Sequence, residues 1–99
     1  MNFEIAPKST EIEANWDDAR LYCFALIIDG KTGWRLPTIE ELIAIYQSKN
    51  DFQKDGCYWS STECSNINYV LVQNMYNGRQ DYGSKNASFY SVRAIRSTL

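Results

Sequence analysis

The sequence predicts an α+β domain, because helical and strand patterns occupy different halves of the chain. Between residues 15 and 50, two segments carry apolar residues at helical spacing, and each starts with a capping residue. From Cys57 onward this spacing stops, and short β-like runs alternate with clusters of glycine, asparagine and serine. The chain has 99 residues, 44% of them hydrophobic, so we expect residues 1–99 to form a single domain.

A short strand and a first helix are expected before residue 30. Apolar and polar residues alternate at positions 3–5, which is typical of a strand. Asn15 can cap the helix, and the acidic residues of its first turn favour the positive end of the helix dipole. We expect this helix to end before Asp29-Gly30. Its predicted core-facing positions are Trp16, Ala19, Cys23 and Leu26.

A second helix is expected to start at Thr38. The Thr38 side chain can cap it, and the third helical residue, Glu41, can reach back to the cap in a capping box. Pro37 fixes the approach of the chain. The predicted buried stripe is Ile39, Leu42, Ile43 and Tyr46, and polar residues 47–50 mark the end of the helix.

The second half of the chain is expected to be strand and loop. Residues 69–75 form the clearest strand, and Asn77-Gly78 is a strong hairpin signal. Residues 79–82 can return antiparallel, and residues 89–95 are predicted to be the last strand.

Four motifs identify a family that the chain resembles. They are Trp16-Asp17-Asp18-Ala19-Arg20 with Cys23, GWRLPTIEEL at 33–42, YWSST at 58–62 and VRAIR at 92–96. Together they resemble the Lcl C-terminal-domain family, a bacterial and phage branch of the C-type lectin-like fold. The resemblance implies two helices packed on a small antiparallel sheet, with adjacent terminal strands and an irregular stretch that carries ligand contacts. The family usually has a cysteine where this chain has Ala94, so Cys23 is expected to be a buried free thiol.

Tyrosine, asparagine and serine are interleaved between Asn66 and Tyr90, a composition typical of antibody binding loops. Some proteins of similar sequence are variable proteins of diversity-generating retroelements, in which mutagenesis enriches these residues after a YWSST-like segment. The alternative interpretation is that they are turn residues and edge-strand packing. The candidate ligand-binding residues are Tyr69, Tyr76, Arg79, Tyr82, Tyr90, Asn66, Asn68, Asn74, Asn77 and Asn86, with Ser84 and Ser88 among them.

Aromatic and guanidinium groups elsewhere in the chain are expected to be structural rather than a ligand box. A tryptophan in a turn before a helix usually fills the core, and Arg35 beside it can pair with a carboxylate such as Glu41. The residues assigned to this structural group are Trp16, Trp34, Arg35, Trp59 and Arg93.

The residue types argue against catalysis and against a bound metal or cofactor. The chain has no histidine, so Ser60 and its neighbours lack the base that a serine nucleophile needs. Three cysteines without a CxxC pair do not form a recognisable zinc site. Cys57 and Cys64 could approach each other, which leaves a disulfide open in an oxidising environment, although we expect them to be reduced. A cysteine-dependent enzyme related to the formylglycine-generating enzymes is the weaker alternative, since their paired cysteines near the C-terminal end are missing.

The net charge of −2 argues against a dedicated nucleic-acid binder. Residues 1–63 hold eleven acids and six bases (11 − 6 = 5 negative), whereas residues 64–99 hold four bases and one acid (4 − 1 = 3 positive), which is either a harmless asymmetry or a weakly basic binding face. No run is long enough to cross a bilayer, so we expect no membrane insertion. The first residues do not resemble a signal peptide, so we expect synthesis in the cytoplasm, and a virion component assembled there would look the same.

These features favour a non-catalytic recognition module. The expected partner is a protein or a cell-surface glycan, in a phage tail, receptor-binding or retroelement-diversified protein that gains avidity as a homo-oligomer. The alternative is a small cytosolic interaction or regulatory domain that uses the same surface on a bacterial partner protein.

Overall fold

The computed structural model describes residues 2–98. Within this part the helices are α1 (Trp16–Ala25) and α2 (Ile39–Gln47), with a short 3-10 helix, η1 (Lys8–Thr10). The strands are β1 (Phe3–Ile5), β2 (Ile12–Glu13), β3 (Trp34–Arg35), β4 (Cys57–Glu63), β5 (Tyr69–Asn74), β6 (Gln80–Ser84), β7 (Ser91–Val92) and β8 (Ile95–Ser97). The predicted α+β class is confirmed.

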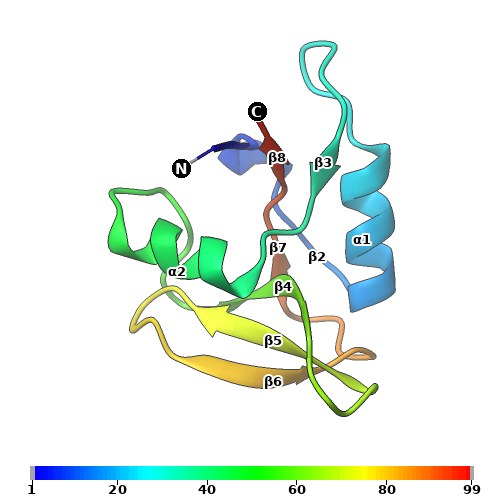
Figure 1. Cartoon of the computed structure of the whole chain (residues 1–99), viewed down its shortest axis with the longest axis vertical. Helices are drawn as coiled ribbons and strands as arrows, with labels where there is room; N and C mark the ends of the chain where they lie inside the picture. Colours follow the sequence, from blue (N-terminus) through cyan, green and yellow to red (C-terminus); the bar gives the residue numbers. More distant parts are fainter. Residues whose placement is uncertain (1, 99) are drawn as a thin grey trace.

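The strands form two sheets, with orders β1-β8-β3 and β2-β7-β4-β5-β6. The first and last strands pair antiparallel, with Phe3 opposite Ser97, so the two ends of the chain lie side by side and the β5–β6 hairpin lies at the other end of the molecule (Figure 1). Neighbouring strands are antiparallel except for the contact between β4 and β7, which is parallel. This arrangement is compatible with the C-type lectin-like fold that the sequence resemblance implies.

Both predicted helix starts are confirmed. The Asn15 side chain accepts a hydrogen bond from the backbone N–H of Asp18 (2.9 Å). Thr38 and Glu41 form both halves of a capping box, which satisfies two backbone N–H groups that a helix start leaves without helical partners.

The predicted end of the first helix was wrong, because α1 stops at Ala25. Asp29 and Gly30 instead form the tip of a tight turn that joins Ile28 to Lys31, and both tip residues have positive φ angles (51° and 78°). Aspartate followed by glycine tolerates this conformation well. The pair therefore shapes a separate projecting loop.

Two hydrophobic clusters pack on opposite faces of the larger sheet. The α1 cluster includes Trp16, Ala19, Cys23, Trp34, Leu36, Trp59, Val70, Val72 and Val92. The α2 cluster is Ile39, Leu42, Ile45, Phe52, Tyr58, Met75 and Ile95. Alternate residues of β4 and β5 enter opposite clusters, as expected for the two faces of a strand.

The buried stripe of the second helix differs from the prediction at two positions. Ile45 is fully buried, whereas Ile43 and Tyr46 are only half-buried. The row that faces the sheet follows steps of three residues from Ile39 through Leu42, which turns Ile43 and Tyr46 to the flanks.

The predicted last strand, residues 89–95, is in fact two strands in different sheets. β7 and β8 are separated by Arg93 and Ala94, which bond instead to the chain near Ala6: the Ala6 N–H donates to the Ala94 carbonyl (2.9 Å). Residues 91–95 are all buried, and a single strand with one solvent-facing side could not bury five consecutive residues.

Arg93 forms a buried polar cluster with Glu11, Asp51 and Tyr58, which we call the Arg93 cluster. Its guanidinium, only 3% exposed, bonds to Glu11 Oε2 (2.7 Å), Asp51 Oδ1 (2.6 Å) and the Ala6 carbonyl (2.6 Å). The Tyr58 hydroxyl donates to the same Glu11 oxygen (2.7 Å). Burial and this carboxylate raise the pKa of Tyr58. The cluster ties three segments that are far apart in the sequence.

Candidate functional site

The β5–β6 hairpin decides where the candidate tyrosines point. The strands pair with Tyr69 opposite Ser84 and Leu71 opposite Tyr82, so these side chains share one face of the sheet. At one end of this face α2 covers the sheet, where the Gln73 side chain donates to the Leu42 carbonyl (3.0 Å). Toward the other end Tyr69 and Tyr82 are exposed, at 38% and 66%.

A hollow of about 350 Å³ lies between these two tyrosines and the loop that leads into β5. It is lined by Cys64, Ser65, Asn66, Tyr69 and Tyr82. Ile67, in the same loop, is 79% exposed. We call this surface, made of Tyr69, Tyr82 and loop residues 64–68, the tyrosine face.

The loop of the tyrosine face is held by short hydrogen bonds. The Asn66 side-chain oxygen accepts from the Asn68 N–H (2.9 Å), and the Asn66 carbonyl accepts from the Tyr69 N–H (3.1 Å). The Asn68 carbonyl accepts from the Lys85 N–H (3.0 Å), and the Lys85 ammonium pairs with Glu63 (3.2 Å). Asn66 therefore builds the turn as well as lining the hollow.

Four candidate residues lie at the opposite end of the hairpin, in the turn that joins β5 to β6. The Asn74 and Asn77 side chains accept from the N–H groups of Tyr76 (2.7 Å) and Arg79 (2.9 Å), as turn residues commonly do. Tyr76 is 74% exposed. Seven residues of chain separate it from Tyr69, roughly 20 Å in a strand, so it does not belong to the tyrosine face.

Tyr90 points into the other side of the sheet. Its ring packs edge-on against Trp59, with centroids 4.8 Å apart, and a Cβ on Gly83 would lie 3.1 Å from that ring. Burial raises the pKa of its hydroxyl. Asn86 is exposed in the loop before it. The structure thus brings Tyr69, Tyr82 and Asn66 together and leaves Tyr90 in a packing role.

The outer edge of β6 carries a local hydrogen bond. The Lys85–Asn68 and Asn74–Arg79 bonds fix the alternation of the ladder, so the backbone N–H of Tyr82 points away from β5. The Asp81 side chain accepts from that N–H (2.8 Å).

The cysteines do not form an internal pair. Cys57 starts β4 and Cys64 follows its last residue, so an extended strand of roughly 20 Å separates them, whereas a disulfide needs Cα atoms about 4.4–6.8 Å apart. The predicted approach of these residues was therefore wrong. Burial and the nearby Asp81 raise the pKa of Cys57, and burial raises the pKa of Cys23 to about 12. Cys23 is a buried free thiol, as predicted.

The hydroxyl groups of the YWSST motif are used by the fold. The fully buried Ser60 donates to the Leu71 carbonyl (2.6 Å), and the Thr62 hydroxyl accepts from the Ile39 N–H at the start of α2 (3.0 Å). Among residues 2–98, no three metal-binding side chains gather in one place. None of the helices in that range has the length and apolarity needed to cross a membrane.

The three tryptophans assigned to the structural group are buried, and each indole N–H donates to a carbonyl. The acceptors are Ser60 for Trp16 (3.0 Å), Lys31 for Trp34 (3.1 Å) and Ala14 for Trp59 (2.8 Å).

Arg35, from the same group, pairs with Glu41 through two bonds of 2.8 Å, as its position suggested. This contact lowers the pKa of Glu41.

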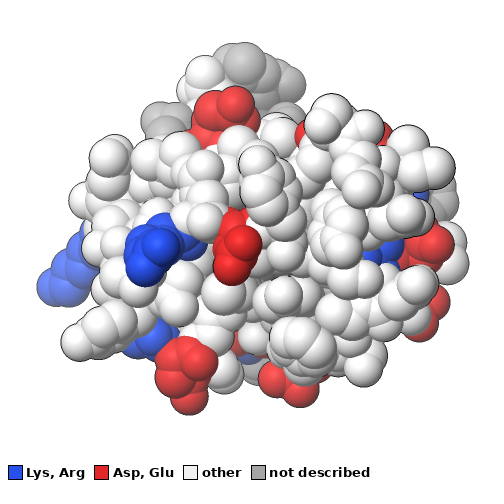
Figure 2. Space-filling view, turned by 90° about the horizontal axis from the view of Figure 1, so that it is seen from below, with Lys and Arg blue, Asp and Glu red and all other residues white. Residues whose placement is uncertain are grey.

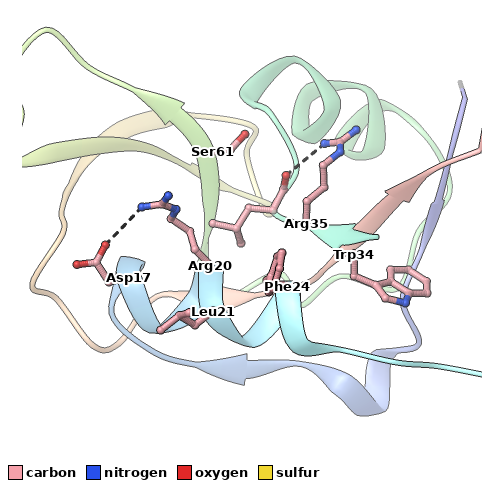
Figure 3. A pocket seen from close by; sticks show the side chains of 8 residues that line it. Asp17, Arg20, Leu21, Phe24, Trp34, Arg35 and Ser61 are labelled. Atoms are coloured by element: carbon pink, nitrogen blue, oxygen red, sulfur yellow. Dashed lines mark hydrogen bonds and ion pairs between the residues drawn. The ribbon is translucent and has the colours of Figure 1, made fainter. Parts of the chain in front are cut away.

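A larger groove beside α1 was missed by the sequence analysis. It has a volume of about 630 Å³. Its lining includes Asp17, Arg20, Leu21, Phe24, Trp34 and Leu36, and we call it the α1 groove. Figure 3 shows Asp17 and Arg20 at one end, Trp34 and Arg35 at the other, and Phe24 between them. The sequence signal was present, because Leu21 and Phe24 are apolar residues outside the predicted core-facing stripe of this helix.

The fold and its surfaces define a small α+β domain that displays exposed aromatic side chains on a well-bonded hairpin. Residues 4–96 match the family model of the Lcl C-terminal domain, and the chain belongs to this family. No curated protein matches the chain at a significant level.

Proposed function

We propose that the domain is a non-catalytic recognition module that binds a protein or glycan surface through the tyrosine face. The observation that carries this proposal is the pair of exposed tyrosines around a shallow hollow, beside the exposed Ile67. Exposed apolar groups gathered on one surface are typical of interaction sites. The Lcl family membership is compatible with this role.

The tyrosine face suits binding without charge. Figure 2 shows the underside of the molecule, on which charged side chains are few and a broad uncharged area lies between them. Tyrosine offers a large, stiff contact area with one polar tip. Because hydrogen bonds already hold the Asn66 loop, little conformational entropy is lost on binding.

A role without catalysis or cofactor is supported by the chemistry of the site. The chain has no histidine, and the YWSST hydroxyls Ser60 and Thr62 are engaged by backbone groups. The raised pKa of Cys57 is the opposite of what an activated thiolate requires.

The biological setting that we favour is a phage tail, receptor-binding or retroelement-diversified protein. Single contacts of this size are weak, and several copies in one assembly would supply avidity. The alternative is a cytosolic interaction domain that presents the same face to a bacterial protein.

The test is binding of the fluorescently labelled domain to intact bacterial cells from its native setting. We expect saturable binding that the double variant Tyr69→Ser, Tyr82→Ser loses. Tyr76→Ser is the matched control, because Tyr76 is at least as exposed but lies at the other end of the hairpin, and it should bind normally.

The outcomes separate the two settings. Protease or glycosidase treatment of the cells identifies the ligand as protein or glycan. If the folded domain does not bind cells but captures a lysate protein through Tyr69 and Tyr82, the cytosolic alternative replaces the first. Equal binding by wild type and double variant in both assays would refute the tyrosine face as the site.

A further inference from the structure

The α1 groove has an apolar wall that no other part of the described chain covers. Leu21 and Phe24 lie one turn apart on the outward side of α1 and are 65% and 82% exposed. Behind them Trp34 and Leu36 are buried and close the floor of the groove. Burying two such side chains favours binding by about 1.5–3 kcal/mol each in area terms, so this wall is a substantial driving force.

One cation at the groove is available to a partner. Arg20 Nη1 and Asp17 Oδ1 are 3.6 Å apart, too far for a hydrogen bond, and both side chains are mostly exposed. The Arg20 guanidinium also stacks over the Trp16 ring, 4.5 Å from its centroid, which orients the plane while leaving its edges for other contacts. Arg35 differs, because its two bonds to Glu41 already occupy it.

We propose that the α1 groove docks an amphipathic helix of a partner protein. The docking helix would carry two bulky apolar side chains about one turn apart and a carboxylate placed to reach Arg20. The volume of about 630 Å³ lies in the range of specific binding sites. The linear row of Leu21 and Phe24 along α1 matches a helix laid beside it, which is a common mode of peptide recognition.

The positions of the apolar side chains favour a helix over a slender acyl chain. Phe24 stands at the rim, and a ligand sunk in the groove would leave most of that ring in water. A helix is broad enough to cover both floor and rim. The inference is independent of the proposed function, since the α1 groove and the tyrosine face share no lining residue.

The experiment uses the whole 15N-labelled chain and two synthetic alanine-rich helical peptides. Both peptides carry two leucines four residues apart, and they differ only in having glutamate or lysine one turn away. Amide chemical shifts are followed as each peptide is added to millimolar concentration. We expect saturable shifts at Arg20, Leu21, Phe24 and Leu36 with the glutamate peptide, and binding of the lysine peptide at least about tenfold weaker.

Two variants assign the contacts. Phe24→Ser should weaken binding of the glutamate peptide at least about tenfold, and Arg20→Gln should remove the preference for glutamate over lysine. Ile67→Ser is the control, because this similarly exposed apolar residue lies on the tyrosine face and should leave peptide binding unchanged. Unperturbed amide shifts in the sheets show that each variant is folded.

The proposal is overturned by any of several results. These are the absence of saturable shifts, equal binding of the two peptides, or shifts at Tyr69 and Tyr82 instead of α1. Concentration-dependent self-association that Phe24→Ser abolishes would make a second copy of this chain the occupant. None of these results affects the cell-binding test of the tyrosine face, so the two proposals can fail separately.

Discussion

The Arg93 cluster and the tyrosine face contain similar residue types but use them in opposite ways. In the cluster, the Tyr58 hydroxyl accepts from the Gln53 N–H (2.8 Å) and donates to Glu11, and the residue is 1% exposed. On the tyrosine face, Tyr82 exposes two thirds of its surface. A tyrosine whose ring and hydroxyl are occupied by the chain stabilises the fold, whereas one displayed on a bonded scaffold can bind something else.

The largest effect should come from Arg93→Met. Removing the guanidinium leaves the Glu11 carboxylate buried without its cation, and breaking a buried pair in this way costs about 3–5 kcal/mol of unfolding free energy. Urea unfolding measures the change. Arg79→Met, at the exposed hairpin turn, should stay within about 0.5 kcal/mol of wild type. A loss below 1 kcal/mol for Arg93→Met would mean that the cluster does not stabilise the fold.

A smaller effect is expected at Gly83, on the inner side of β6 beneath the tyrosine face. An added Cβ would lie 2.8 Å from Val72, 3.0 Å from Trp59 and 3.1 Å from Tyr90, so Gly83→Ala should destabilise by about 1–3 kcal/mol. Gly56→Ala is the control, since a Cβ there meets nothing within 4 Å. Thermal unfolding compares them. If both variants melt alike, the inner face is looser than the structure indicates.

Acid should weaken the Arg93 cluster modestly. The hydrogen bond from Arg93 holds the pKa of Asp51 below its ordinary value. A lowered native pKa stabilises the fold at neutral pH, and this stabilisation is lost as pH falls below about 4. The Asp51 side chain is 60% exposed, so the contribution is at most about 1 kcal/mol. The stability difference between wild type and Asp51→Asn should therefore shrink from pH 7 to pH 3, and a constant difference would contradict this linkage.

The smallest effect on stability is expected at the tyrosine face itself. Tyr82→Ser removes a mostly exposed ring and should change the unfolding free energy by about 0.5 kcal/mol or less. The same variant should reduce binding strongly. Tyr90→Ser provides the contrast, since its ring packs on Trp59 and its loss should destabilise the domain measurably. Equal destabilisation by both variants would remove the distinction between displayed and packed tyrosines.

The features predicted correctly from the sequence are mostly local. A capping box involves residues three apart, and the helix stripes and the Asn77-Gly78 turn are likewise short-range patterns. The strands β2 and β3 have two residues each, too few to show a period, and their positions depend on partners elsewhere in the chain. The break between β7 and β8 depends on bonds from Arg93 to residues at the beginning and middle of the chain.

The same limit applies to the candidate site. Composition identified residues 66–90, but the faces of the hairpin and its length divide the four tyrosines among three places. The α1 groove combines residues from α1 and from the turn before α2, so composition alone could not reveal it. Its signal was the placement of Leu21 and Phe24 outside the expected stripe.

The bond between the Asp81 carboxylate and the Tyr82 N–H has a consequence for solubility at high local concentration. β6 is an edge strand with an exposed aromatic ring, and such strands can add further strands and polymerise into fibrils. At Tyr82 the carboxylate occupies the donor that an incoming strand would use and places a negative charge on the edge. Copies of the domain can therefore be crowded together without their sheets joining edge to edge.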